Sequence, residues 1–142
     1  MRCQIARRAN QGQALVEAAL VTLAFLLLFV GAFDFGQVFF VHQSLVERAR
    51  AAARWGAVHP YHPEAIRNYV LYGRPLAAEP ARPVGFLGLT PANVSVSRFD
   101  AGTEADRIVV RIEGYRFYFL TPLIAGQRTG QAVVVVMPYE GS

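Results

Sequence analysis

The sequence predicts an α+β fold in which one long N-terminal helix packs on a small antiparallel sheet. Hydrophobic residues make up 54% of the 142-residue chain and charged residues only 17%, against about 25% charged residues in ordinary soluble domains. The apolar excess gathers in residues 18–33, which carry no charge. After residue 92 the chain changes to short alternating apolar stretches separated by turns that contain glycine, a pattern typical of strands.

The first half of the predicted helix is long enough to cross a membrane. Residues 14–33, here called the span, would extend about 30 Å as a helix, which matches the hydrocarbon thickness of a bilayer. Glu17 is the only charged residue in the span and lies near its beginning. Three arginines lie within residues 1–12 and the next is Arg48. The positive-inside bias therefore predicts a cytoplasmic N-terminus and a C-terminal part on the periplasmic or outer side.

The second half of the predicted helix is amphipathic. Apolar residues recur at three- and four-residue spacing through residues 35–53, which is the period of a one-sided helix. Gly56 and Pro60 supply the signal that ends it. The pattern predicts a helix of about 43 residues, roughly 65 Å long, with Gly31 and Gly36 as candidate bend points.

The remaining residues predict a small α+β domain. A short helix is expected at 64–72 and a proline-containing loop at 75–91, followed by strands at 93–99, 107–120 and 131–137 that form an antiparallel meander. A turn at 100–102 and a loop at 121–130 would join these strands, with a bend at Gly114 where the apolar parity of the middle strand changes. The last strand is apolar on both faces, so we expect the long helix to cover one face and a partner chain the other.

The charge distribution argues against a nucleic-acid partner. The formal net charge is +4, but with the leader arginines set aside the rest of the chain carries 11 basic and 10 acidic residues. No clustered basic surface is then left to bind phosphates. Cys3 is the only cysteine, which excludes an intramolecular disulfide and a zinc site built on cysteines.

No catalytic or metal-binding pattern is present, so we expect no enzymatic activity, no cofactor and no metal. Asp34 and the two residues after it spell a kinase magnesium motif, yet the lysine and the glycine-rich and catalytic loops of a kinase are missing. His59, His62 and Glu64 lie in a loop that ends a helix, without a fourth ligand in sequence. The serines lack the sharp glycine-flanked turn of hydrolases.

The residues around the beginning of the span resemble a known family. The sequence QGQALVEAALV at 11–21, after a short basic leader, is similar to a type IV prepilin processing site. Together with GAFDFGQVFF at 31–40, RARAAARWGA at 48–57 and a terminal VVVVMPYE, it resembles the TadE-like proteins, which are pseudopilins of the tight-adherence (Flp) pilus system. The fold implied by this resemblance is pilin-like.

The resemblance implies a processing site at Gly12, Gln13 and Glu17. A prepilin peptidase would cleave after Gly12, leaving Gln13 first and Glu17 fifth in the mature chain. Ala18 stands where tight-adherence pilins usually carry an aromatic residue. A charged residue at bilayer depth costs about 2.5–3.5 kcal/mol, and the new amine at Gln13, or that of a neighbouring subunit, would compensate Glu17. The alternative is a carboxylate that sits at the interface in contact with water.

Four residues are candidates for helix contacts during assembly: Glu17, Asp34, Phe35 and Phe39. Asp34 would mark the outer membrane interface, and His42 falls on the apolar stripe of the second half of the helix. The aromatic cluster from Tyr115 to Phe119 is interpreted either as core or as an exposed face that docks a partner pilin.

The first functional hypothesis is a structural minor pilin or pseudopilin. The chain would be divided into a basic leader (1–12), a transmembrane and amphipathic helix (13–57) and a periplasmic or extracellular domain (58–142). It would lie in the bacterial inner membrane or enter an extracellular pilus, with other pilins, inner-membrane assembly proteins, the prepilin peptidase and the lipid bilayer as partners. Two alternatives stay open, a single-span anchored scaffold domain and a binding domain exported by a signal peptide that ends near Phe33.

Overall fold

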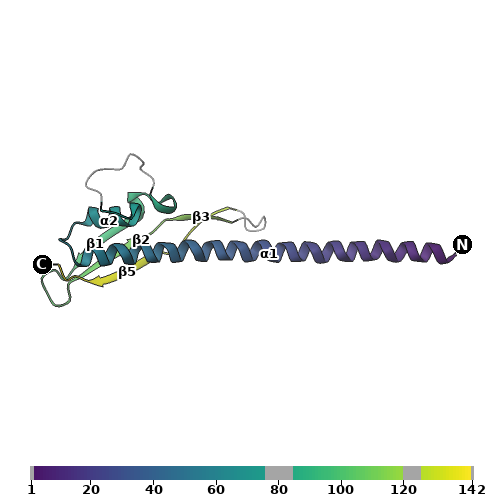
Figure 1. The fold of residues 1–142 in the computed structure, drawn as a ribbon, viewed down its shortest axis with the longest axis horizontal. Coiled ribbons are helices and arrows are strands. Elements are labelled where there is room, and N and C mark those ends of the chain that lie inside the picture. Colours follow the sequence, from purple (N-terminus) through teal and green to yellow (C-terminus); the bar gives the residue numbers. More distant parts are fainter. Residues whose placement is uncertain (1, 76–84, 120–125, 142) are drawn as a thin grey trace.

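The computed structural model describes residues 2–75, 85–119 and 126–141, and from residue 12 onward it also describes side chains, except those of 126 and 127. It consists of one very long helix with a small α+β head at its C-terminal end (Figure 1). The helices are α1 (Arg2–Ala57) and α2 (Pro63–Tyr72), with two 3₁₀ turns at Phe86–Gly88 and Pro91–Asn93. The strands are β1 (Val94–Phe99), β2 (Arg107–Ile112), β3 (Arg116–Phe119), β4 (Gly126–Thr129) and β5 (Val133–Pro138).

Helix α1 is longer than the sequence predicts. It has 56 residues, which corresponds to about 84 Å, because it begins at Arg2 instead of near residue 13. The leader is rich in alanine, arginine and glutamine, contains no proline, and so has good intrinsic helix propensity. The expected bend points at Gly31 and Gly36 are wrong, since one straight helix passes through both (Figure 1). Its end at Ala57 agrees with the predicted stop.

The three main strands form the expected antiparallel sheet. Its order is β1-β2-β5, with β2 in the centre. Val110 of β2 lies opposite Val96 on one side and opposite Val135 on the other. The predicted antiparallel arrangement is therefore confirmed for this sheet.

The predicted strand at 107–120 is divided in two. The sheet pairing of β2 ends where Glu113 N donates to the Asn93 carbonyl at 2.8 Å, and Gly114 then takes a φ of +66°, which glycine adopts at little cost. The bend expected at Gly114 is thus present, and it redirects the chain into a second, two-stranded sheet of β3 and β4. Strand β4 corrects the loop predicted at 121–130, of which 121–125 lie outside the described residues.

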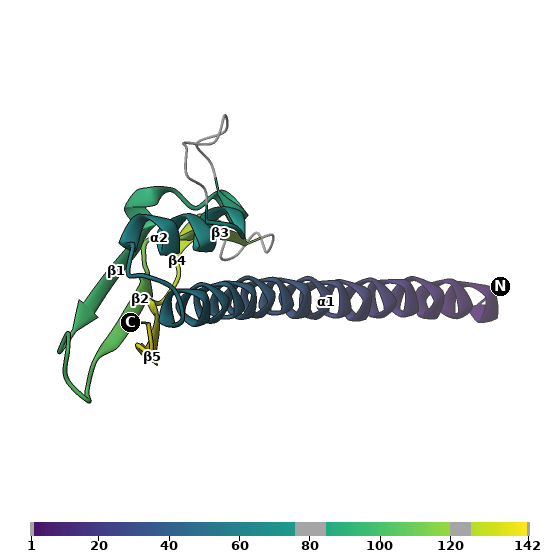
Figure 2. The same cartoon turned by 60° about the vertical axis from the view of Figure 1, so that its left-hand side comes forward.

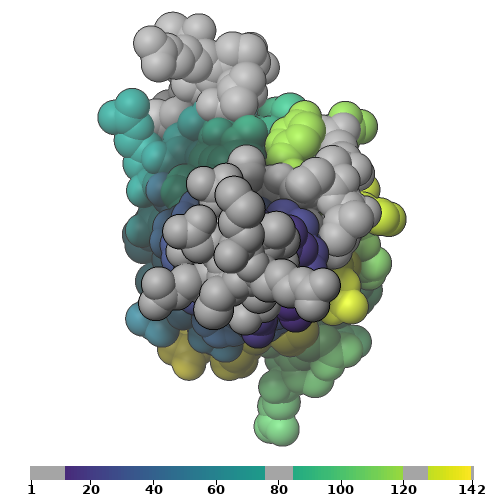
Figure 3. All heavy atoms as spheres, turned by 90° about the vertical axis from the view of Figure 1, so that its right-hand side faces the viewer, coloured from purple at the N-terminus to yellow at the C-terminus, as the bar shows by residue number. Residues whose placement is uncertain are grey.

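The core of the head lies between α1, α2 and the three-stranded sheet. Helix α1 contributes a buried stripe at three- and four-residue spacing, and the other elements contribute branched aliphatic side chains. The buried residues include Leu45, Ala49, Ala52 and Ala53 from α1, Ile66, Val70 and Leu71 from α2, and Ile108, Val110 and Ile112 from β2. Viewed along α1 from its N-terminal end, α2 lies on one side of the helix and β5 on the other (Figure 3).

Strand β5 is covered on one face only. Val133 is buried and Val135 and Met137 are half-buried on the side that packs against α1, as predicted for that face. Val134 and Val136, on the other face, are exposed. The covering of that second face by a partner chain stays a prediction.

Candidate membrane and assembly surface

The N-terminal part of α1 projects from the head as an isolated apolar rod (Figure 2). It contains one stretch that is long and apolar enough to cross a membrane, and none of this stretch is buried against the rest of the chain. The exposed large side chains of the span include Leu15, Leu20, Leu23, Phe25, Leu28, Phe29 and Phe33. An unburied helix of this composition is suited to lipid or to other apolar helices, which is consistent with single-pass membrane anchoring.

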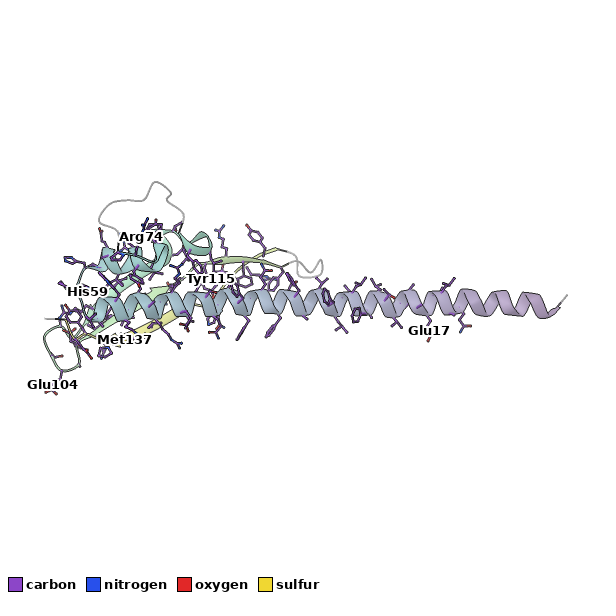
Figure 4. All side chains as sticks on the ribbon, in the orientation of Figure 1. Glu17, His59, Arg74, Glu104, Tyr115 and Met137 are labelled. Atoms are coloured by element: carbon purple, nitrogen blue, oxygen red, sulfur yellow. The ribbon has the colours of Figure 1, made fainter. Side chains whose placement is uncertain are left out.

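Gly12, Gln13 and Glu17 all lie on this exposed part of the helix. Gln13 and Glu17 are one helical turn apart, and Figure 4 shows the Glu17 side chain far from the head. A Cβ atom built on Gly12 would meet nothing within 4 Å, so the fold of the single chain does not require glycine there. Glycine inside a helix costs roughly 0.5–1 kcal/mol relative to alanine. Any requirement for Gly12 therefore comes from outside this chain.

The residues just beyond the span differ sharply in exposure. Asp34 is only 4% exposed, whereas Phe35 is 75% and Phe39 is 58% exposed. The subunit itself thus shields the carboxylate at this height and leaves the two phenylalanines accessible. The assembly role of these three residues stays a prediction, with Phe35 and Phe39 as the ones whose rings a neighbour can reach.

A groove of about 240 Å³ lies where the β3–β4 hairpin meets α1. Phe35, Phe39 and His42 line it from the helix, and Tyr115 and Phe117 line it from the hairpin side. Phe117 and Phe119 contact each other edge to face, with ring centroids 5.3 Å apart. These contacts place the hairpin beside residues 35–42 of α1.

His42 and Tyr115 connect the hairpin to the helix. His42 Nδ1 and Tyr115 Oη lie 3.2 Å apart and share a hydrogen bond, and Tyr115 lies between α1 and the hairpin in Figure 4. Burial raises the pKa of the Tyr115 hydroxyl above its ordinary value. Gly130 leaves room for the Tyr115 ring, which a Cβ at Gly130 would overlap. Sequence reasoning missed this pair, because 73 positions separate the two residues.

The aromatic cluster from Tyr115 to Phe119 is partly core and partly exposed. Tyr115 is buried in the core, and Phe117 and Phe119 are half-buried. Tyr118 is 64% exposed. One side of the cluster therefore belongs to the fold and the other faces outward.

An ion pair between Arg98 and Asp106, here called the clasp, lies at the end of the head away from the span. Arg98 Nε donates to Asp106 Oδ1 at 2.9 Å, and Gly102 N donates to Asp106 Oδ2 at 2.9 Å. The hydrogen bond from Arg98 is the main cause that lowers the pKa of Asp106 from 3.8 to about 2. The Arg98 guanidinium also lies 4.0 Å from the centre of the Tyr139 ring. The clasp holds the C-terminal segment beside the end of α1, where Glu140 N donates to the Ala57 carbonyl at 2.9 Å.

His59, which was considered as a metal ligand, instead contacts Trp55. His59 stacks on Trp55, with ring centroids 4.4 Å apart, and its Nδ1 donates to the Trp55 carbonyl at 2.8 Å. It therefore caps the last turn of α1. Within the part of the chain that the structure describes, no three His, Cys, Asp or Glu side chains are placed to hold a metal ion.

Comparison with known families matches part of α1. The family model of TadE-like protein matches residues 12–54, which confirms the resemblance over that segment. No curated protein and no solved structure shows significant similarity to the chain. The match begins at Gly12, covers the span and most of the amphipathic part of α1, and ends at residue 54, close to the end of α1 at Ala57.

Proposed function

We propose, from the TadE-like match at residues 12–54, that the protein is a structural minor pilin or pseudopilin that takes part in assembly of a tight-adherence pilus. The observation that carries this proposal is that the matched segment coincides with the exposed part of α1 and its continuation under the head. A helix with an unburied apolar surface can leave lipid for a bundle of similar helices. The mechanism is therefore packing, and the head stays outside the bundle.

The proposal includes cleavage after Gly12 by a prepilin peptidase on the cytoplasmic side. Gly12 has open space around its Cα within the subunit, which supports an external reason for a glycine at this position. Glu17 then lies one turn from the new amine at Gln13, where opposite charges stabilise each other. Its exposure also leaves it accessible to the amine of a neighbouring subunit.

Amino-terminal sequencing of the membrane-extracted protein tests this function. When the protein is expressed with its cognate peptidase, the mature chain is expected to begin at Gln13, and without the peptidase at Met1. Gly12→Leu should block processing, while Gly36→Ala, at an open glycine of α1 beyond the span, should leave it unchanged. A chain that begins at Met1 in the presence of the peptidase would favour an anchored scaffold domain. A chain that begins near Phe33 would favour an exported one.

A further inference from the structure

The β3–β4 hairpin has a composition unlike the rest of the head. It carries two arginines and three aromatic residues, and the sequence between Gly114 and Ala132 contains no acidic residue. The side chains concerned are Arg116, Phe117, Tyr118 and Phe119 in β3 and Arg128 in β4. Basic and aromatic side chains together are typical of surfaces that contact the headgroup layer of a membrane.

The height of the hairpin along α1 agrees with this composition. Phe117 lines the same groove as Phe35 and Phe39, which lie about 3–9 Å beyond the end of the span at Phe33. The headgroup layer extends roughly 5–7 Å beyond the hydrocarbon core on each side. Strand β3 runs toward the N-terminal end of α1 (Figures 1 and 2), so Tyr118 and Phe119 lie still closer to the bilayer.

The two faces of β3 have different surroundings. Phe117 and Phe119 are half-buried, and Phe117 lines the groove against α1. Arg116 and Tyr118, which alternate with them, are exposed. The solvent-exposed surface of Arg116 and Tyr118 therefore lies where lipid headgroups can reach it.

We propose that the β3–β4 hairpin is a second membrane contact, whose outward face rests in the headgroup layer beside α1 and binds anionic phospholipid headgroups. The Tyr118 ring suits the interface because it has an apolar body and a polar hydroxyl, and the Arg116 guanidinium matches the phosphate groups. Of the other proposals, this inference requires only that the span crosses a bilayer. It depends neither on a role in a pilus nor on which side of the membrane the head occupies.

Tryptophan quenching in vesicles tests the contact with the full-length chain. Trp55 is the only tryptophan, so Trp55→Phe gives a silent background that keeps an aromatic ring beside His59. Single tryptophans are then introduced by Tyr118→Trp in the hairpin, Phe99→Trp at the end of β1 in the other sheet and Phe29→Trp in the span. Each replaces an exposed aromatic side chain, so the three variants are matched. The vesicles contain phosphatidylcholine and phosphatidylglycerol, with spin labels either on the headgroup or on the acyl chain.

The expected result is strong quenching at position 118 by headgroup labels, quenching at 29 by acyl-chain labels, and little quenching at 99. Equal weak quenching at 118 and 99, with 29 still quenched, would overturn the hairpin contact and leave the span intact. Loss of quenching at 29 would overturn the span and the inference with it. Protection of Trp at position 118 from solvent that increases with the protein-to-lipid ratio, without quenching by labelled lipid, would instead identify a contact with a second copy of the chain. That result would also overturn the proposal.

A charge variant tests the preference for anionic lipid. On the Tyr118→Trp background, Arg116→Gln is expected to reduce the ratio of docked to undocked hairpin about fivefold in vesicles that contain phosphatidylglycerol. It should have little effect in phosphatidylcholine alone. Arg54→Gln is the matched control, because Arg54 is an exposed arginine near the end of α1, about 30 Å beyond the span. Equal effects of the two substitutions would contradict the proposed headgroup binding.

Discussion

Single glycines of α1 have different physical reasons for their presence. Gly12, Gly31 and Gly36 have nothing within 4 Å of a built Cβ, whereas the Cβ of Gly56 would lie 2.6 Å from Ile66 Cδ1 of α2. Only Gly56 is therefore required by the fold of the isolated subunit. At the other three positions the monomer has room for a Cβ atom. If glycine is required there, the requirement comes from contacts with other molecules.

The His42–Tyr115 pair gives a prediction for one hydroxyl group. Tyr115→Phe removes the hydrogen bond to His42 Nδ1 and leaves the ring in place over Gly130, so the free energy of unfolding should fall by about 1 kcal/mol. Tyr69→Phe, whose ring stays stacked on Trp55, is the matched control and should change it less. Denaturant unfolding of the protein in detergent micelles measures both. An unchanged midpoint for Tyr115→Phe would show that the pair contributes nothing to docking of the hairpin.

The Arg98–Asp106 clasp predicts a dependence of stability on acid. Because the hydrogen bond from Arg98 lowers the pKa of Asp106 from 3.8 to about 2, the fold favours the ionised carboxylate. The stabilisation is complete above pH 3.8 and is lost as the pH falls through about 2. Asp106→Asn should lower the melting temperature at neutral pH and flatten the profile between pH 4 and about 2. Asp100→Asn, in an exposed pair with Arg107, should leave that slope in place.

At the scale of elements, the contact between α1 and α2 is made close by small residues. Ala49, Ala52, Ala53 and Gly56 form the buried stripe of α1, and their short side chains let α2 and the sheet approach its backbone. Ile66 fills the space directly over Gly56. The amphipathic half of α1 therefore serves as the central element of the head.

Matched substitutions in one helix test this close contact. Gly56→Ala should lower the free energy of unfolding by about 1–3 kcal/mol, because the added methyl group overlaps Ile66 and overpacking strains the core. Gly36→Ala, in the same helix with open space around it, should raise stability by roughly 0.5–1 kcal/mol. Thermal unfolding followed by circular dichroism measures both changes. If the two variants shift in the same direction, the helix contact is looser than the structure shows.

Local sequence patterns predicted most of the elements. The three- and four-residue spacing of α1 and the alternation of β1, β2 and β5 are local signals, so the end of α1, the start of β2 and the bounds of β1 and β5 agreed with the structure within a few residues. The start of α1 and the end of β2 did not. Strand β4 was missed because its sequence, GQRT, lacks the β-branched and aromatic pattern of strands, and pairing with β3 forms it. The His42–Tyr115 pair is likewise a product of tertiary folding. The Arg98–Asp106 clasp could have been found by aligning β1 and β2 across their predicted turn.

At the scale of the whole molecule, the head cannot be separated from the helix at residue 57. Leu45 and three alanines of α1 lie in the same core as Ile108 and Val110 of the sheet. A chain that begins after α1 would expose that surface to water. The apolar rod and the head therefore share one element, whose first half is exposed and whose second half is buried.

Truncation tests this shared element. A chain of residues 37–142 retains the buried stripe of α1 and should fold as a dispersed domain. A chain of residues 58–142 loses it and should be unfolded or aggregated. The dispersion of amide signals in NMR spectra distinguishes the two states. A folded 58–142 chain would show that the sheet and α2 are sufficient without α1.

The unbroken course of α1 also has a mechanical consequence. Because the helix runs without a kink from the span into the core of the head, the span and the head are rigidly coupled. A rotation of the anchor by one residue, about 100°, would swing the whole head through the same angle. In a bilayer, the face that the span presents to neighbouring helices would thus determine the direction in which the head points.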